Sequence, residues 1–170
     1  FFQEFSRIMA GLKDAITAGA DGKVKVTFSA LCASLQAMLG RYGVNAMGEF
    51  GSHATAEKFL RDAGLNPSDF PITPLANGKF GIGMPESVVQ DVINSMLIFG
   101  QPYVGAEWDT ARYNAWLSGK DNHVEKLQHY SQVLAERYSR VNDILNNLIK
   151  VLSATIDSIT EADKSFIHAL

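Results

Sequence analysis

The chain has 170 residues, of which 46% are hydrophobic and 19% are charged, and its formal net charge is −3. This composition suits one or two folded units, and the scattered Lys and Arg residues provide no basic surface for nucleic acid. No apolar run approaches the roughly 20 residues that span a bilayer, and no signal-peptide pattern is visible. The single cysteine excludes an internal disulfide. Because the chain starts with Phe1 rather than Met, and Phe1 already fits a helical pattern, we expect it to belong to a longer protein.

The N-terminal segment is predicted to be a helix over residues 1 to 17, because apolar residues recur at spacings of three and four. Residues 23–28 alternate strictly between apolar and polar side chains, which predicts a half-buried strand. Thr27 or Ser29 is then expected to cap a helix that Gly43 ends. A loop over residues 44–53 and a short helix over residues 56–63, capped by Ser52 or Thr55, follow.

The next segment contains a strong hairpin signal, Asn77-Gly78, between two apolar alternations. Pro71 and Pro74 confine its first arm to the edge of a sheet. Pro85 suits the first turn of a further helix, and Gly100, Pro102 and Gly105 are expected to end it. The hairpin and the strand at residues 23–28 are expected to share one three-stranded sheet.

The C-terminal segment from Asp109 to Leu170 is predicted to be one long helix. Placed at 100° per residue, its apolar side chains from Val141 to Ile159 fill an arc of about 160°, and polar side chains fill the other side. The apolar spacing averages roughly 3.5 to 3.6 residues per turn, which predicts a weakly left-handed coiled coil. One neighbouring helix covers an arc of only about 100°, so two partners are expected along this helix.

These elements predict an α+β fold: a long antiparallel coiled-coil rod with a small mixed α/β insertion between its two arms. Residues 1–19 are assigned to the first coiled-coil helix, which is too short to cover the rod. Residues 20–105 are assigned to the insertion, with about three strands and three helices, and residues 106–170 to the long helix.

The sequence contains no recognisable catalytic or metal site. Its four histidines, at positions 53, 123, 129 and 168, lack metal-ligand spacing. The glycine-rich residues 78–83 have their glycines in the wrong order for a phosphate-binding loop and fit a tight hairpin. Cys32 has no neighbouring base and is expected to be a small core residue. We therefore expect no enzymatic activity and no cofactor.

The most distinctive stretch is WDTARYNAW, residues 108–116. Asp109 fits the N-cap of the long helix, while Trp108, Tyr113 and Trp116 are large enough to anchor the insertion to the base of the rod. A ligand-stacking box is the alternative interpretation of the same aromatic residues.

This stretch, together with Tyr138-Ser139, residues 147–153 and residues 162–167, resembles the C-terminal half of the IpaD/SipD/BipD family. The opening residues 1–6 also resemble the end of that family's first long coiled-coil helix. The family comprises the needle-tip proteins of bacterial type III secretion systems.

The resemblance implies a secreted, non-enzymatic virulence protein at the bacterial cell surface, which caps the needle as a ring of about five copies. It would hold back secretion until host contact and then serve as a platform for the translocator proteins in cell invasion. It also implies an N-terminal helical hairpin that packs against the rod. Some relatives bind bile salts, and such a steroid could lodge between rod and insertion.

Family members also bind the needle subunit through the rod, in a helix-in-groove mode. On this sequence the expected contact has a polar rim with apolar flanks: Asn142, Asp143, Asn146, Asn147, Lys150 and Asp157, flanked by Ile144, Ile149 and Val151. The competing function is an intracellular coiled-coil adaptor or chaperone that pairs through the rod. An enzyme built on the insertion is the third possibility, and no convergent polar groups favour it.

Overall fold

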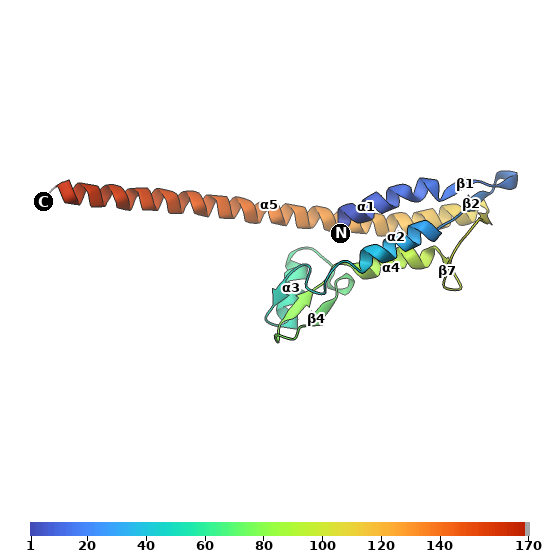
Figure 1. Cartoon of the computed structure of the whole chain (residues 1–170), viewed down its shortest axis with the longest axis horizontal. Helices are drawn as coiled ribbons and strands as arrows, with labels where there is room; N and C mark the ends of the chain where they lie inside the picture. Colours follow the sequence, from blue (N-terminus) through green and yellow to red (C-terminus); the bar gives the residue numbers. More distant parts are fainter. Residues whose placement is uncertain (169–170) are drawn as a thin grey trace. The chain divides into compact units, whose positions relative to one another are not determined.

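The computed structural model describes the backbone of residues 1–168 and the side chains of residues 1–155. The chain forms two compact units, Phe1–Ser131 and the residues from Gln132 onward. The longest element, α5 (Thr110–His168), contributes to both units, and the other helices and all strands belong to the first. Figure 1 shows these elements coloured along the sequence.

The N-terminal helix is shorter than its apolar pattern predicts. Helix α1 spans Phe2–Ala10, a 3-10 turn follows at Gly11–Asp14, and strand β1 then occupies Ile16–Ala18. The predicted helix over residues 1 to 17 is therefore wrong beyond Ala10. Gly11 is a poor helix former, while the β-branched Ile16 and Thr17 favour a strand that can pair with residues 24–26.

The strand predicted at residues 23–28 is confirmed as β2 (Val24–Val26). It lies at the centre of an antiparallel sheet with the order β1-β2-β8, where β8 is Ala106–Trp108. Val24 pairs with both Ala18 and Trp108. Both edges of β2 are thus occupied, so the predicted sheet shared with the hairpin is wrong.

The predicted hairpin is confirmed as β4 (Ile72–Pro74) and β5 (Phe80–Ile82), joined by a turn in which Leu75 N donates to Lys79 O over 2.8 Å. The sheet order is β3-β5-β4, so the proline-containing β4 lies at an edge, as predicted. Strand β3 (Glu49–Phe50) lies within the predicted loop and was missed. Gly81 is required by packing, since an added Cβ would lie 2.7 Å from Val44 O.

The first unit has three further α-helices: α2 (Ser29–Leu39), α3 (His53–Asp62) and α4 (Glu86–Ser95). Helix α2 ends before the predicted Gly43 because the chain turns back toward α1, where Tyr42 Oη donates to Glu4 Oε2 over 3.0 Å. The predicted Ser52 cap of α3 is confirmed, with Thr55 N donating to Ser52 Oγ over 3.1 Å. A 3-10 turn, η3 (Pro67–Asp69), follows α3.

Helix α4 begins directly after Pro85, as predicted, and buries Val88, Val89, Val92 and Ile93. It ends at Ser95, earlier than predicted, because residues 97–102 form a second hairpin from β6 (Leu97–Ile98) and β7 (Gln101–Pro102). Residues 20–105 therefore contain the three predicted α-helices but six strands instead of about three.

The core of the first unit lies where α2 contacts both α1 and α4. Cys32 is buried there, and burial raises the pKa of its thiol, in agreement with a core residue. Pairing of residues 1–17 with the long helix as a coiled coil is not confirmed and stays a prediction. The largest fully buried side chains are Phe5, Phe28, Leu35, Met38, Leu60, Ile82, Ile93, Met96 and Leu127.

Candidate partner-binding surface

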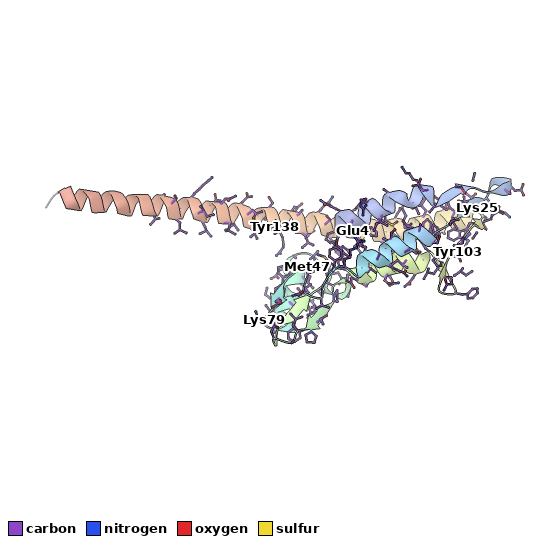
Figure 2. All side chains as sticks on the ribbon, in the orientation of Figure 1. Glu4, Lys25, Met47, Lys79, Tyr103 and Tyr138 are labelled. Atoms are coloured by element: carbon purple, nitrogen blue, oxygen red, sulfur yellow. The ribbon has the colours of Figure 1, made fainter. Side chains whose placement is uncertain are left out.

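The second unit presents an exposed row of large apolar side chains on α5. Each of them is at least 51% exposed, and Tyr138, at 73%, is labelled on the helix in Figure 2. We call this row the apolar stripe: Tyr138, Val141, Ile144, Leu145, Leu148, Ile149, Val151 and Leu152. No other surface within the described side chains combines so many large apolar residues in one helix.

Helical geometry places the apolar stripe on one side of α5. At 100° per residue its members fill an arc of about 160°. The predicted polar contact residues occupy the opposite side and are exposed: Asn142, Asp143, Asn146, Asn147 and Lys150. Asp157 belongs to the helix, but its side chain lies outside the described residues.

An apolar stripe of this kind favours contact with another protein. Burying one aliphatic side chain of this size stabilises a complex by roughly 1.5–3 kcal/mol. Amphipathic helices bind partners by laying such a row into a groove or against other helices. The predicted contact residues Ile144, Ile149 and Val151 belong to the stripe, at its flanks.

The start of α5 is held by the WDTARYNAW stretch, within the first unit. Arg112 N donates to Asp109 Oδ1 over 2.7 Å, a side-chain cap for the first turn. Trp116 stacks on Phe28 with ring centroids 5.0 Å apart, and its Nε1 donates to Ser95 Oγ over 3.1 Å. One aromatic side chain thereby joins α5 to the residues preceding α2 and ending α4.

The remaining aromatic residues of this stretch also pack within the first unit. Trp108 is 3% exposed, and the Arg112 guanidinium lies 4.8 Å from the centroid of its ring. Arg112 also donates to Tyr103 Oη over 2.6 Å, and Tyr113 lies against Trp116 at 6.2 Å. These contacts favour the anchor interpretation over the ligand-stacking one, because neighbouring side chains already occupy the rings.

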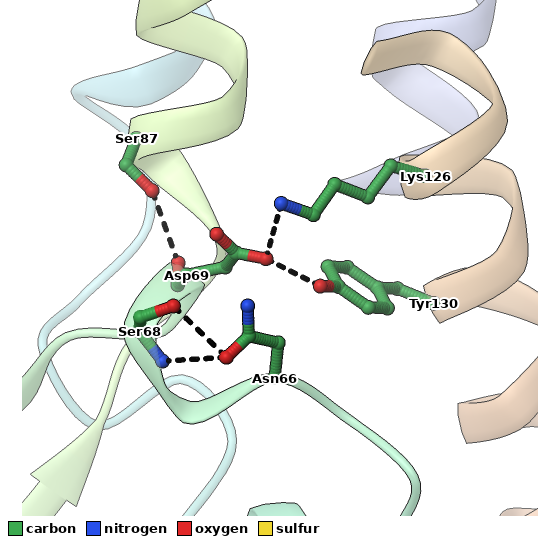
Figure 3. A network of polar contacts seen from close by, with 6 residues as sticks. All are labelled: Asn66, Ser68, Asp69, Ser87, Lys126 and Tyr130. Carbon is green, nitrogen blue, oxygen red and sulfur yellow. Dashed lines mark hydrogen bonds and ion pairs between the residues drawn. The ribbon is translucent and has the colours of Figure 1, made fainter. Parts of the chain in front are cut away.

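Figure 3 shows a polar network that sequence reasoning missed. Asp69, at the end of η3, pairs with Lys126 of α5 over 2.7 Å and accepts a hydrogen bond from Tyr130 Oη. Ser87 Oγ of α4 donates to Asp69 O over 3.3 Å. The four-residue spacing of Lys126 and Tyr130 signals one helix face, but nothing in the sequence identifies Asp69 as their partner.

Burial is the largest cause of a pKa shift at Tyr130, followed by its hydrogen bond to Asp69 and the charge of that carboxylate. Together they raise the pKa of Tyr130 well above its ordinary value. The phenol therefore keeps its proton as a donor to Asp69. This network fastens η3 and α4 to the first part of α5.

The described residues lack a group of side chains suited to metal chemistry. No cluster of three His, Cys, Asp or Glu side chains suited to a metal ion occurs among them. Within the same residues, no helix has the length and apolar character needed to cross a membrane. The glycine-rich residues 78–83 form the turn and second arm of the β4–β5 hairpin.

Comparison with known proteins identifies the family to which this chain belongs. Residues 1–167 match the model of a family described as type III secretion systems tip complex components. The chain belongs to this family. The resemblance noted from the sequence motifs is thereby confirmed, and the tip complex family is a family of structural secretion-system components.

Two relatives in this family are the translocator proteins BipD of Burkholderia pseudomallei and Burkholderia thailandensis. Each is 29% identical over 168 residues, which covers 99% of this chain and 49% of the relative. The chain thus spans about half the length of these relatives. Two solved structures of BipD from Burkholderia pseudomallei match with TM-scores of 0.66 and 0.65 at 26% identity. They cover 94% and 93% of this chain, and 55% and 56% of the solved chains.

Proposed function

We propose that this chain acts at the tip of a bacterial type III secretion needle, as a secreted protein that caps the needle and controls secretion. It would serve there as a platform for translocator proteins during host-cell invasion. Family membership over residues 1–167 supports this role. The observation that carries the mechanism is the apolar stripe, because a needle-tip protein has to bind other helical proteins along its length.

The needle subunit is the proposed partner of α5. The apolar flanks Ile144, Ile149 and Val151 would pack against a needle helix. The polar residues Asn142, Asn146 and Lys150 would form hydrogen bonds at the rim, and Asp143, Asn147 and Asp157 would extend it. All of these residues except Asp157, whose side chain is not described, are exposed and available.

Competition for the stripe provides a mechanism of control. A helical segment from elsewhere in the longer protein would cover the stripe in the resting state as the coiled-coil partner. A needle helix or a neighbouring copy would then take its place, so that the same apolar side chains serve both autoinhibition and assembly. Assembly as about five copies and bile-salt binding are further predictions from the resemblance.

A binding titration tests the needle contact. Isotope-labelled chain is titrated with the cognate needle subunit, held monomeric by mutation, and chemical shifts are followed by NMR. We expect shifts concentrated in residues 142–157. Binding that leaves this segment unperturbed would contradict the proposed site.

Two substitutions sharpen this test. Ile144→Asp and Val151→Asp place charges at the stripe and should abolish binding while helicity by circular dichroism stays unchanged. Gln132→Asp introduces the same charge at an exposed position of α5 outside the proposed contact and should bind normally. Retained binding in both stripe variants would contradict the proposal.

The alternative function is an intracellular coiled-coil adaptor or chaperone, which the exposed stripe also permits. It predicts a cytosolic dimer formed through α5 and no affinity for the needle subunit. Cell fractionation separates the two functions, since a tip protein appears in the secreted fraction only when the secretion system is intact.

A further inference from the structure

The β6–β7 hairpin carries an exposed apolar tip in the first unit. Ile98 pairs with Gln101, so Phe99 and Gly100 form a two-residue turn. The φ values of Phe99 and Gly100 are +48° and +79°, positive at both positions as a type I′ turn requires. Phe99 is 98% exposed and Ile98 is 41% exposed. We call these two residues the apex, and Figure 1 shows the hairpin, labelled at β7, extending beyond the end of α4.

The stability of the turn does not explain Phe99. Positive φ is unfavourable for a bulky residue, and the first position of a type I′ turn prefers Asn, Asp or Gly. An exposed ring also gains no burial within its own chain. No charged residue occurs between Leu97 and Ala106, so the apex is free of charge on both sides. An aromatic residue at this position therefore indicates an apolar contact outside the chain.

Hydrogen bonds hold the base of the hairpin in the first unit. Tyr103 N donates to Met96 O over 3.1 Å, and Phe28 N donates to Tyr103 O over 2.7 Å. Phe99 lies three residues beyond Met96, which is about 10 Å along an extended strand. The apex is thus presented on a fixed base, and a contact there needs no rearrangement of the unit.

Two cations lie at the same base. Lys25 is exposed, and its side chain passes beside the chain that leaves the hairpin, since a Cβ added at Gly105 would lie 3.3 Å from Lys25 Cε. Arg112 is exposed as well, and its guanidinium donates to Tyr103 Oη over 2.6 Å. Neither cation forms an ion pair with a side chain that the structure describes.

Two carboxylates flank these cations but contact backbone groups. Glu107 is the partner of Lys25 in the β2–β8 register, and its Oε1 accepts a hydrogen bond from Ala20 N over 3.4 Å. Asp109 Oδ1 accepts from Arg112 N over 2.7 Å at the start of α5. Both cationic side chains therefore retain N–H groups for an external anion, and phosphate oxygens are strong acceptors for such donors.

We infer that this hairpin binds the surface of a phospholipid bilayer. The apex enters the boundary between headgroups and acyl chains, while Lys25 and Arg112 contact the lipid phosphates. The dimensions agree, because the apex lies about 10 Å from its base and interfacial elements enter a bilayer by roughly 5–10 Å. Aromatic side chains favour this depth, and basic side chains favour the headgroup layer above it.

A bilayer fits the shape of this surface better than a protein partner does. The apex is a convex tip with one large ring, for which a protein would need a matching pocket, whereas a bilayer accepts it without one. The peptide groups of the turn stay hydrated at the interface, so the tip enters no deeper. This inference goes beyond the proposed function, since it adds lipid to the protein partners of the chain.

Paired variants test this contact. Phe99→Asn removes the ring and suits the turn, so its melting temperature should equal or exceed that of the wild type. Val44→Asn is its control, because Val44 is 51% exposed in a loop away from the hairpin. Lys25→Gln removes one cation of the base. Lys79→Gln removes an exposed cation at the turn of the β4–β5 hairpin and is the matching control.

Cosedimentation with vesicles of equal parts phosphatidylcholine and phosphatidylserine measures binding. Wild type, Val44→Asn and Lys79→Gln should bind alike. Phe99→Asn should bind at least ~10-fold more weakly, because the ring is no longer buried in lipid. Lys25→Gln should bind ~5-fold more weakly, since it lacks one contact with the anionic surface. Wild type that does not bind, or unimpaired binding of Phe99→Asn or Lys25→Gln, would overturn the inference.

The apolar stripe is a second apolar surface, so the series is repeated in the Ile144→Asp, Val151→Asp double variant. The effect of Phe99→Asn should persist there, and its disappearance would overturn the inference. Phe99→Trp keeps an aromatic apex and reports its surroundings by fluorescence. After subtraction of the wild-type emission, its emission should shift to shorter wavelength with vesicles, and an unshifted emission would also overturn the inference.

Two further readouts separate the alternatives. Self-association of the wild type that Phe99→Asn abolishes, without binding to vesicles, would assign the apex to a second copy and overturn the inference. The needle-subunit titration is repeated on Phe99→Asn, whose substitution lies outside residues 142–157. Normal needle binding by a wild type that does not bind vesicles would overturn this inference alone and leave the proposed function standing.

Discussion

Lys126 Nζ lies 2.7 Å from Asp69 Oδ2, an ion pair between α5 and a 3-10 turn far away in the sequence. The Asp69 side chain is only 13% exposed, in contrast to the surface ion pairs of α3. Tyr130 donates to the same carboxylate and packs its ring against Phe70 at 5.1 Å. The network therefore combines charge, hydrogen bonding and apolar packing at one place.

Asp69→Asn should lower the free energy of unfolding by about 1–3 kcal/mol. It removes the negative charge that pairs with Lys126 and accepts the hydrogen bond from Tyr130. Chemical denaturation measures this change. Asp62→Asn is the matched control: Asp62 pairs with Lys58 over 2.6 Å, but its side chain is 55% exposed. The control substitution should lower the free energy of unfolding by less than about 0.5 kcal/mol. Equal effects of the two substitutions would contradict the prediction that the buried position of Asp69 makes its ion pair more stabilising.

Tyr130→Phe should change the pH dependence of stability. Burial and Asp69 raise the pKa of Tyr130 in the folded state, so the folded chain holds this proton more tightly than the unfolded chain. The resulting stabilisation is complete below about pH 10 and is lost as the pH rises beyond that value. The urea midpoint of the wild type should therefore fall more steeply above about pH 10 than that of Tyr130→Phe; parallel curves would refute the prediction.

Trp116→Ala should destabilise the first unit by about 3 kcal/mol, since it removes the stacking on Phe28 and the hydrogen bond to Ser95. Trp116→Phe keeps a ring on Phe28 and should cost about 1 kcal/mol. Thermal and urea unfolding measure both variants. A Phe variant as unstable as the Ala variant would show that the hydrogen bond, rather than the stacking, dominates.

Leu127→Ala and Leu148→Ala should differ sharply although both lie on α5. Leu127 is 1% exposed, so its truncation should cost about 2–5 kcal/mol. Leu148 is 56% exposed, and the same change should stay within about 0.5 kcal/mol in the isolated chain. A large destabilisation by Leu148→Ala would mean that the apolar stripe is already covered in solution.

Cys32 should react with thiol reagents only when the protein opens. Its side chain is 1% exposed and burial raises its pKa, so little reactive thiolate is available in the folded state. The labelling rate in native buffer should follow the local or global opening equilibrium and increase with added urea. Rapid labelling without denaturant would contradict the buried position.

Local signals in the sequence predicted the elements that depend on nearby residues. Asn77-Gly78 identified the β4–β5 hairpin, Pro71 and Pro74 its edge position, and Ser52 the start of α3. The strand partners could not be predicted in this way. Pairing of β2 with β8 joins distant segments, and two-residue strands such as β3 carry too few residues for a periodic pattern.

In the candidate site, too, local sequence patterns predicted some features, while features that depend on distant segments were missed. Helical periodicity alone placed Ile144, Ile149 and Val151 at the two flanks of one apolar arc on α5, where they are exposed. It has no bearing on the turn between β6 and β7, where Phe99 is 98% exposed at a positive φ, and so this residue was not singled out. The Asp69 network was also missed, since it depends on how η3 folds against α5.

The position of β2 between β1 and β8 has a consequence for the order of folding. Its pairing with β1 is local and needs only the tight turn after Ala18, whereas its pairing with β8 must close a long loop that includes α2, α3 and α4. Loop closure costs entropy that rises slowly with length, and distant pairings slow folding. During synthesis the first hairpin can therefore form early, while the strand that leads into α5 docks only after Trp108 has left the ribosome.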